Sequence, residues 1–405
     1  MKILVVNGGS SSHKCSLYTL DGALPRHPPT PDWSAQLDWH AQQSTATLTL
    51  QTGPGIRDQR LVAEDPSEAL VQLLATLWDG AHRVLSGPEA VDCIGHRVVH
   101  GGETYQRPVV IDDSVKAAID RFTALAPLHN SINLAGIQLT ESLFPKTPQV
   151  AVFDTAFHRQ LPAAAAIYPG PYGWIDQGIR RYGFHGISHE YCARQAAMLL
   201  DKNLADLSLM ICHLGNGSSL SAVQNGHSVD TTMGFTPLEG LMMGTRSGSI
   251  DPGILIALMR QGASAEDLDH LLNQESGLQG ISGVSSDWRQ IEAAVAQGNQ
   301  RAQLAREIYL HRLKAEMGRM LMSLNGHLDA LLFTAGIGEH ASALRSQVCA
   351  ALEFIGMRLD QAKNQANLVN QNIADPNSQI QVFVIEAQEN WAIAQACHRL
   401  FPTQP

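Results

Sequence analysis

The segments 3–20 and 209–223 show the same pattern of a short apolar run, a turn rich in Gly and Ser, and a second apolar run. Ile3–Val6 leads into the first turn, and the second turn contains Gly215–Ser219. Such a pattern predicts a strand, a tight turn and a returning strand. Its recurrence predicts an internal duplication, with one unit opening each of two domains around a shared cleft. The alternative is chance similarity between two hairpins.

The second segment continues into an arginine among small residues, Arg246 beside Gly244, Ser247 and Gly248. Glycines in a turn let backbone N–H groups approach an anion closely. An arginine with small neighbours is exposed for bidentate contact with phosphate or carboxylate. A plain hairpin beside an unrelated arginine is the alternative for either half alone, but together the two features predict a phosphate-handling site.

Length and charge limit the possible classes of protein. A chain of 405 residues exceeds one compact core, so two domains are expected, and 44% hydrophobic residues with 34 glycines fit a globular α/β enzyme. The net charge of −10 argues against nucleic acid or an anionic membrane as the main partner. The start MKILVV is too short for the apolar region of a signal peptide. Six scattered cysteines without a CxxC pair indicate buried thiols in a reducing cytoplasm.

Further elements follow from periodicity. Residues 66–86 and 114–143 have helical spacing, and 301–324 is expected to be the longest amphipathic helix. Short apolar runs predict core strands at 93–100, 150–153 and 330–334, and 24–60 is expected to form peripheral strands and loops.

Three charged residues near the predicted turns and strands are candidates for a site, each with an ordinary alternative. Lys14 follows the first turn, where the P-loop spacing is absent, and a solvated lysine is the alternative. Arg97 shares a face of its strand with Val99, which would suit a short carboxylic acid, although an internal ion pair is the commoner role. Asp154 follows a strand end, a position that favours a metal or catalytic carboxylate, and an N-cap is the alternative.

His185 and His189 are four residues apart, but the third ligand and the HExxH pattern that zinc would need are missing. His185 has glycines close by on both sides, at positions 183 and 186, which is typical of a residue that donates a hydrogen bond to charge developing in a transition state. His189 is expected to be structural. The turn Gly336–Gly338 after a strand is a weak signal, and Glu389 reads by default as a surface charge.

Nine ordered motifs make the chain resemble acetate kinases from end to end. They are NGGSSSHK (7–14), GHRVVHGGE (95–103), APLHN (126–130), VFDTAFH (152–158), RRYGFHGISH (180–189), HLGNGSS (213–219), TPLEGLMMGTRSGSIDPG (236–253), GISGVSSDWR (280–289) and FTAGIGE (333–339). The resemblance implies an α/β fold of two duplicated actin-like ATPase domains, as in the acetate and sugar kinase, actin and chaperone-ATPase superfamily, around a nucleotide cleft. It implies an N-terminal acid and metal domain of residues 1–150 plus 386–405, a nucleotide-binding domain of 151–385, and a homodimer.

The resemblance also implies roles for individual residues. Asp154, His185 and Arg246 would be catalytic, with His185 stabilising the transition state. Mg²⁺, with Mn²⁺ as an alternative ion, would bind near Asn7 and Glu389. The acid would be held by Arg97 and by an apolar wall of Val99, Leu128, Phe184 and Pro237. ATP would be bound by Lys14, His213, Leu214, Gly215, Asn216, Gly217, Asp287, Trp288, Arg289, Gly336, Ile337, Gly338, Glu339 and His340.

The implied reaction is reversible, direct in-line transfer of a phosphoryl group from ATP to acetate. Propionate kinase is one alternative, and a nucleotide-binding homologue that has lost turnover is another. This chain departs from the usual family pattern at Ser249, where an aspartate is common, and at Ile187 and His340. Loss of the acid at position 249 could loosen the loop that carries Arg246.

Overall fold

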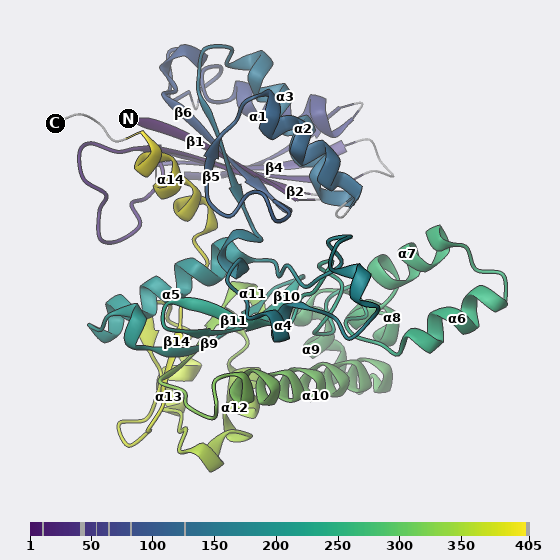
Figure 1. The fold of residues 1–405 in the computed structure, drawn as a ribbon. Coiled ribbons are helices and arrows are strands. Elements are labelled where there is room, and N and C mark those ends of the chain that lie inside the picture. Colours follow the sequence, from purple (N-terminus) through teal and green to yellow (C-terminus); the bar gives the residue numbers. More distant parts are fainter. Residues whose placement is uncertain are drawn as a thin grey trace. The chain divides into compact units, whose positions relative to one another are not determined.

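The computed structural model describes residues 1–9, 12–40, 45–53, 55–63, 65–81, 83–124 and 127–401. The chain forms two compact units (Figure 1). Unit 1 comprises Met1–Ala156 with Gln388–Pro405, and unit 2 comprises Phe157–Ala387.

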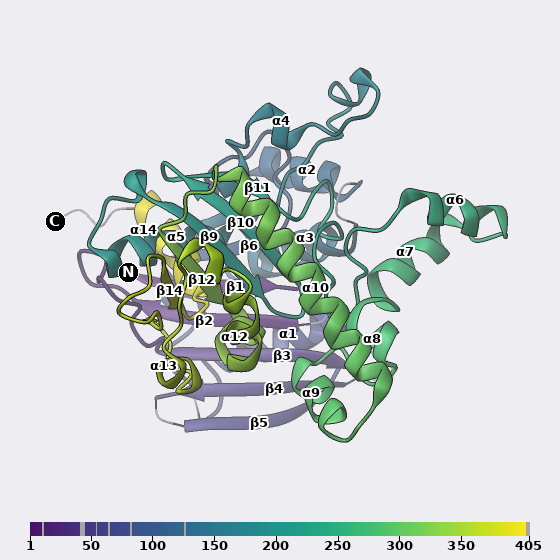
Figure 2. The same ribbon diagram turned by 90° about the horizontal axis from the view of Figure 1, so that it is seen from below.

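Unit 1 is built on an eight-stranded sheet in the order β5-β4-β3-β2-β1-β6-β8-β7, and Figure 2 shows its antiparallel strands side by side. β1 pairs antiparallel with β2 and parallel with β6, which pairs parallel with β8. The strands are β1 (Lys2–Gly8), β2 (Ser12–Thr19), β3 (Trp33–His40), β4 (Thr45–Thr52), β5 (Gly55–Val62), β6 (Cys93–Val98), β7 (Val109–Val110) and β8 (Gln149–Phe153).

Unit 2 contains a six-stranded sheet in the order β11-β10-β9-β12-β14-β13. β9 pairs antiparallel with β10 and parallel with β12, which pairs parallel with β14. The strands are β9 (Ser208–Leu214), β10 (Ser218–Gln224), β11 (His227–Thr231), β12 (Ala330–Thr334), β13 (Gln371–Asn372) and β14 (Gln381–Val384).

The two sheets share one topology. The series β3-β2-β1-β6-β8-β7 matches β11-β10-β9-β12-β14-β13 strand for strand, with the same parallel and antiparallel pairs. Chance similarity of two hairpins would not extend to four further strands. The predicted α/β fold with an internal duplication is therefore confirmed.

Helices cover both faces of the unit 1 sheet. Successive residues of a strand point to opposite faces. Ile94 belongs to the core that contains α1, whereas a Cβ on Gly95 would collide with Ile393 and Cys397 of α14. The helices of unit 1 are α1 (Pro66–Ala75), α2 (Asp113–Arg121), α3 (Pro127–Leu143) and α14 (Glu389–Leu400).

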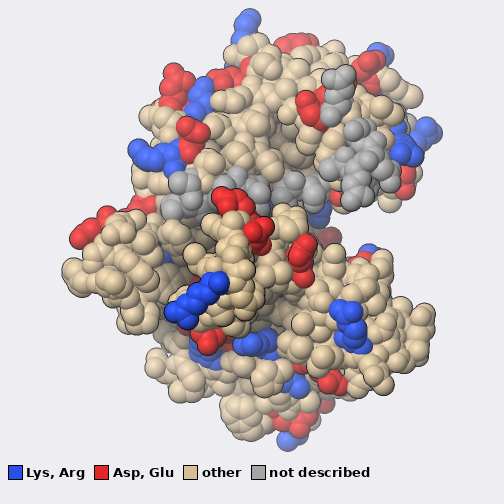
Figure 3. Space-filling model, turned by 90° about the vertical axis from the view of Figure 1, so that its right-hand side faces the viewer, with Lys and Arg blue, Asp and Glu red and all other residues tan. Residues whose placement is uncertain are grey.

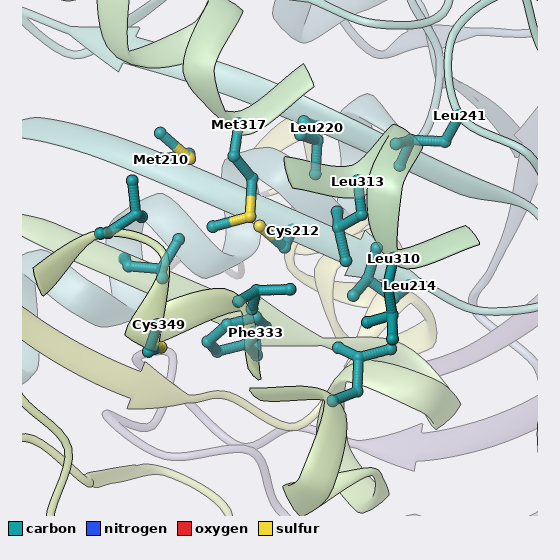
Figure 4. Close-up of a cluster of buried hydrophobic side chains, with 14 of the residues drawn as sticks. Met210, Cys212, Leu214, Leu220, Leu241, Leu310, Leu313, Met317, Phe333 and Cys349 are labelled. Atoms are coloured by element: carbon teal, nitrogen blue, oxygen red, sulfur yellow. The ribbon is translucent and has the colours of Figure 1, made fainter. Parts of the chain in front are cut away.

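Alternation also separates two layers in unit 2. Met210, Cys212 and Leu214 of β9 pack into a large apolar core with Leu313 and Met317 of α10 (Figure 4). The other face of β9 lies against α5. The helices of unit 2 are α4 (Ala163–Ala166), α5 (Gly186–Leu200), α6 (Pro252–Arg260), α7 (Ala265–Gln274), α8 (Gly277–Ser282), α9 (Trp288–Ala296), α10 (Gln300–Ser323), α11 (Ala335–His340), α12 (Ser342–Ala350) and α13 (Gln361–Gln365).

Several predicted elements have different limits in the structure. The helix expected over 66–86 ends at Ala75, and the helix expected over 114–143 is divided into α2 and α3. Pro127 explains the division, because proline begins a helix well but cannot continue one. The long helix predicted at 301–324 is confirmed as α10, whose N-cap Asn299 accepts a hydrogen bond from the N–H of Ala302.

The described helices include none with both the length and the apolar character that crossing a membrane requires. All six cysteines are buried free thiols. On the face drawn in Figure 3, acidic and basic side chains are interspersed among uncharged surface.

Candidate active site

The glycine turn of unit 2 is held in shape by its own hydrogen bonds. It joins β9 to β10, where the Gly215 N–H donates to the carbonyl oxygen of Gly217 at 3.0 Å. The Ser218 hydroxyl donates to the Gly215 carbonyl at 3.1 Å and lies 3.3 Å from the hydroxyl of Tyr309. The turn is thus a fixed backbone loop, as a phosphate cradle requires.

Two of the predicted catalytic residues lie beside this turn. A methyl group placed on Gly217 would lie 3.4 Å from Nε2 of His185 and 3.6 Å from Nη1 of Arg246. An imidazole edge, a guanidinium and a glycine backbone therefore surround one small region of unit 2. This combination of donors suits a phosphoryl group whose charge grows in a transition state.

His185 is positioned by a left-handed backbone and by its neighbours. It has φ of 56°, which is uncommon for a residue with a side chain, and it immediately precedes α5. Its Nδ1 lies 2.9 Å from the Ser219 hydroxyl. Its ring stacks on His213, with ring centroids 4.2 Å apart. The Nδ1 contact and the stacking orient the imidazole so that its Nε2 edge faces Gly217.

The loop that carries Arg246 is bonded to the glycine turn. The Gly244 N–H donates to the carbonyl oxygen of Asn216 at 3.0 Å, and a Cβ on Gly244 would collide with the Asn216 amide oxygen. Arg246 itself donates from Nη1 to the carbonyl oxygen of Pro237 at 3.0 Å. The structure thus brings together His185, Asn216, Gly217, Pro237 and Arg246 in unit 2.

The residues predicted to surround adenosine differ from one another in how far they are exposed. Asp287 caps α9 by accepting from the N–H of Arg289 and forms an exposed ion pair with the Arg289 guanidinium. Trp288 is only 7% exposed, and its ring packs in the core against Tyr309. A core tryptophan offers little of its ring to a ligand, so any contact with adenosine would involve its backbone or a small edge.

The segment 336–340 is the short helix α11, in place of the expected glycine turn. Glu339 is buried, its carboxylate accepts from the N–H of Ala387 at 2.9 Å, and burial raises its pKa. Arg345 donates from Nη1 to the carbonyl oxygens of Gly338 and Glu339 at 2.8 and 2.7 Å and is fully buried. Arg345 escapes detection from the sequence because it lies within an ordinary helical pattern.

In unit 1, Arg97 and Asp154 form a buried ion pair. Nε and Nη2 of Arg97 donate to one carboxylate oxygen of Asp154 at 2.9 and 2.5 Å. Burial acts to lower the pKa of Arg97, but the carboxylates of Asp154 and Glu389 outweigh it and the net shift is upward. The pair uses one edge of the guanidinium and leaves the Nη1 group for a second acceptor. The ion-pair role and the substrate role are therefore compatible.

The predicted metal residues meet through side chains. Nδ2 of Asn7 donates to Glu389 at 3.0 Å and to Oδ1 of Asn390 at 3.1 Å. Glu389 is the first residue of α14, so it is not the isolated surface charge that its position in the sequence suggested. Lys14 is exposed on β2, in register with Asn7 of β1.

Val99 lies beyond the end of β6, contrary to the strand predicted over 93–100. Its N–H donates at 3.0 Å to Oδ1 of Asn133, so an amide side chain replaces the next strand partner. Val99 is 2% exposed and Phe184 is 1% exposed. Leu128, the other predicted wall residue, lies outside the described side chains.

Comparison with known proteins agrees with this arrangement. Residues 2–395 match the acetokinase family. The chain is 57% identical to the acetate kinase of Acaryochloris marina, over 98% of this chain and 99% of that protein. Among solved structures, an acetate kinase of Porphyromonas gingivalis and a propionate kinase of Francisella tularensis are each 36% identical over 98% of this chain and 99% of theirs, with TM-scores of 0.87 and 0.88. These matches extend over nearly the whole chain, and they accompany the duplicated fold and the glycine turn with its histidine and arginine. The protein therefore belongs to the acetokinase family.

Proposed function

We propose that the protein is an enzyme that transfers the γ-phosphoryl group of ATP to acetate, giving ADP and acetyl phosphate, by reversible in-line transfer. The observation that carries the proposal is that His185 and Arg246 both lie close to Gly217 of the glycine turn. Membership of the acetokinase family supports the choice of a carboxylate as acceptor.

The chemistry needs positioning and charge rather than a general base. A carboxylic acid of this size is ionised at neutral pH, so acetate is already a nucleophile. Phosphoryl transfer then depends on alignment and on neutralising charge on the transferred group. His185 and Arg246 would donate to its oxygens, and the backbone of His213–Gly217 would hold the neighbouring phosphates with help from Lys14.

The acid is assigned to the residues for which the family resemblance implies that role. Arg97 would bind the acetate carboxylate through the Nη1 group that Asp154 does not use. Val99, Phe184 and Pro237, with Leu128, would contact the methyl group. We propose that unit 1 is the acid and metal domain and unit 2 the nucleotide domain; the limits expected from the sequence, 1–150 plus 386–405 and 151–385, differ by a few residues from those of the two units. Adenosine is assigned to 287–289 and 336–340.

The oxygen ligands of unit 1 fit a magnesium ion. No cluster of three or more His, Cys, Asp or Glu ligands occurs among the described residues. Mg²⁺ commonly binds through one or two carboxylates plus substrate phosphates and water, so a smaller set suffices. The carboxylates of Asp154 and Glu389 both raise the pKa of Arg97, and the Asn7 amide donates a hydrogen bond to Glu389. Asn7 and Glu389 would hold Mg²⁺, or Mn²⁺ in its place, with Asp154 close by, and the ion would neutralise phosphate charge when bound.

A homodimer would cover an apolar helix of unit 2. In Figures 1 and 2, α6 and α7 extend away from the sheet of this unit. None of the residues of α6 is buried, and Ile254, Ile256 and Met259 are 47%, 52% and 56% exposed. We propose a second copy of the chain as the occupant of this face, consistent with the expected homodimer. Ile256→Asp should then shift the mass measured by light scattering to that of a monomer, and an unchanged mass would contradict this placement.

We also propose a cytoplasmic location, supported by six buried free thiols, which persist in a reducing compartment.

Trapping with hydroxylamine tests the activity. Protein mixed with ATP, Mg²⁺, acetate and hydroxylamine should form acetyl hydroxamate, because hydroxylamine intercepts acetyl phosphate. The control omits acetate. Absence of hydroxamate at high enzyme concentration, with ATP still bound, would favour the nucleotide-binding homologue without turnover.

A further inference from the structure

Strand β10 divides its side chains between two different environments. Leu220 and Ala222 point into the apolar core of unit 2. The residues that alternate with them, Ser219 and Ser221, bond to histidines at the start of α5. Both serines are fully buried. A buried hydroxyl needs a partner, so these contacts constrain which protons each histidine carries.

The contacts form a continuous chain that ends on His185. Oγ of Ser221 lies 2.8 Å from Nδ1 of His189, and Nε2 of His189 lies 2.8 Å from Oγ of Ser219. The same Ser219 oxygen lies 2.9 Å from Nδ1 of His185. His189 thus uses both ring nitrogens, and Ser219 bridges the two histidines.

Counting hydrogens leaves two possible directions for the chain. A serine hydroxyl has one hydrogen and two lone pairs, so Ser219 can donate to only one of the two histidines. Accepting from both would leave its own buried hydrogen without either histidine as acceptor, which is costly, so we take Ser219 to donate to one histidine and accept from the other. Burial lowers the pKa of His189 well below its usual value, so this ring is neutral and carries a single N–H. Either every donor points toward His185, or every donor points away from it.

The site beside Gly217 selects between these directions. Nε2 of His185 faces the region that Arg246 also borders. An unprotonated Nε2 would direct a lone pair at phosphoryl oxygens and repel them. A doubly protonated His185 would add a second positive charge near Arg246. A neutral ring with its proton on Nε2 avoids both costs, and it requires the Nδ1 of His185 to accept from Ser219.

We propose that Ser219 and His189 are positioning residues that hold His185 as a neutral imidazole with its proton on Nε2. The Ser221 hydroxyl donates to Nδ1 of His189, Nε2–H of His189 donates to Ser219, and Ser219 donates to Nδ1 of His185. His185 then donates from Nε2 to the transferred phosphoryl group. The choice of direction rests on phosphate binding beside Gly217, and the last step rests on the proposed phosphoryl transfer.

Nitrogen-15 NMR of the histidine rings tests the proton positions without any turnover. With MgATP added to the wild-type protein, His185 and His189 should each show a protonated Nε2 and an unprotonated Nδ1. A proton on Nδ1 of His185, or on both of its nitrogens, would overturn the proposal. Failure to make acetyl phosphate would instead remove the proposed function and leave the ring assignments intact.

Kinetics of matched variants test the positioning role. Loss of a residue that orients a catalytic group typically lowers activity about 10–100-fold. Ser219→Ala should therefore lower kcat by at least about tenfold, with KM for ATP and acetate within about twofold, because the contact acts on the transition state. Ser219→Thr keeps the hydroxyl and should restore most of kcat.

Thr140→Val is the matched control. Thr140 is a buried hydroxyl 3.3 Å from Nε2 of the buried His96, in unit 1 and outside the proposed machinery. It should change kcat by less than about twofold. A Ser219→Ala enzyme with unchanged kcat would overturn the proposal, as would equal losses in Ser219→Ala and Thr140→Val. If Ser219→Ala does not fold, the NMR measurement on the wild type decides.

Discussion

The N–H of Ser249 donates to the carbonyl oxygen of Gly240 at 2.9 Å, and the Ser249 hydroxyl accepts from the N–H of Gly240 at 3.0 Å. These two bonds close the loop between residues 240 and 249, which carries Arg246. The family resemblance led us to expect an aspartate at this position and a looser loop with serine. In the structure, the Ser249 hydroxyl oxygen accepts the hydrogen bond from the Gly240 N–H, as an aspartate carboxylate oxygen could also do.

Two substitutions of Ser249 should therefore separate the effect of the hydrogen bond from the effect of a negative charge at this position. Ser249→Ala removes the hydroxyl that accepts from the Gly240 N–H, so one of the two hydrogen bonds is lost. This loss should lower the free energy of unfolding by about 1 kcal/mol. Ser249→Asp should keep kcat within about threefold of the wild type, because it retains an acceptor. Urea unfolding and kcat measure the two effects. A larger loss of kcat in Ser249→Asp than in Ser249→Ala would contradict this account.

Arg246→Ala should lower kcat by roughly 10²–10³, the usual cost of deleting one charge contact to a transition state. Arg246→Lys should give an intermediate rate, since lysine keeps the charge but lacks the planar fork. Initial rates with saturating ATP and acetate give the comparison. A change below about threefold in Arg246→Ala would show that this arginine acts elsewhere.

Val99→Ala should favour a longer acid. If Val99 contacts the acetate methyl group, its truncation makes room for another methylene, which is worth about 1–3 kcal/mol in a pocket. We expect the ratio of kcat/KM for propionate to that for acetate to rise about tenfold. Val98→Ala is the control, because Val98 is equally buried but packs in a separate apolar cluster. A similar rise in Val98→Ala would remove Val99 from the acid site.

Buried neutral histidines should make the protein less stable as the pH falls. Burial lowers the pKa of both His96 and His158 to about 4. The unfolded chain binds a proton at these positions below about pH 6.5, whereas the folded chain does so only near pH 4. Each group therefore reduces the free energy of unfolding by up to about 1.4 kcal/mol per pH unit across this window.

Urea unfolding at several values between pH 4.5 and 7 measures this slope. His96→Gln should reduce it, because glutamine does not titrate. Val98→Ala, which changes a buried residue without a titratable group, should leave the slope unchanged. An identical slope in His96→Gln and the wild type would contradict the assignment of a neutral buried ring.

The duplicated strand pairs could be predicted from the sequence because β1 and β9 are short, almost wholly apolar runs bounded by glycine. Local patterns failed where distant contacts decide. The ring of Trp288 packs against Tyr309 of α10, a contact between residues far apart in the sequence that no local pattern indicates. Val99 leaves its strand because Asn133, far along the chain, takes its N–H.

The site was predictable to the same extent. Gly217 and Arg246 stand among small residues, which marks them locally. The supporting roles of Ser219 and Arg345 depend on partners in other elements, so the sequence gives no comparable sign of them. His189 was expected to be structural; it is buried and contacts Ser219 and Ser221, and its role in positioning His185 is our proposal.

The preference of the enzyme among acceptor acids tests the central claim most directly. kcat/KM should be measured for acetate, propionate and butyrate with MgATP, following acyl phosphate formation for each acid. The account predicts the highest value for acetate and a decline with each added methylene. An equal or higher value for propionate, or no acyl phosphate from any of the three acids, would contradict it.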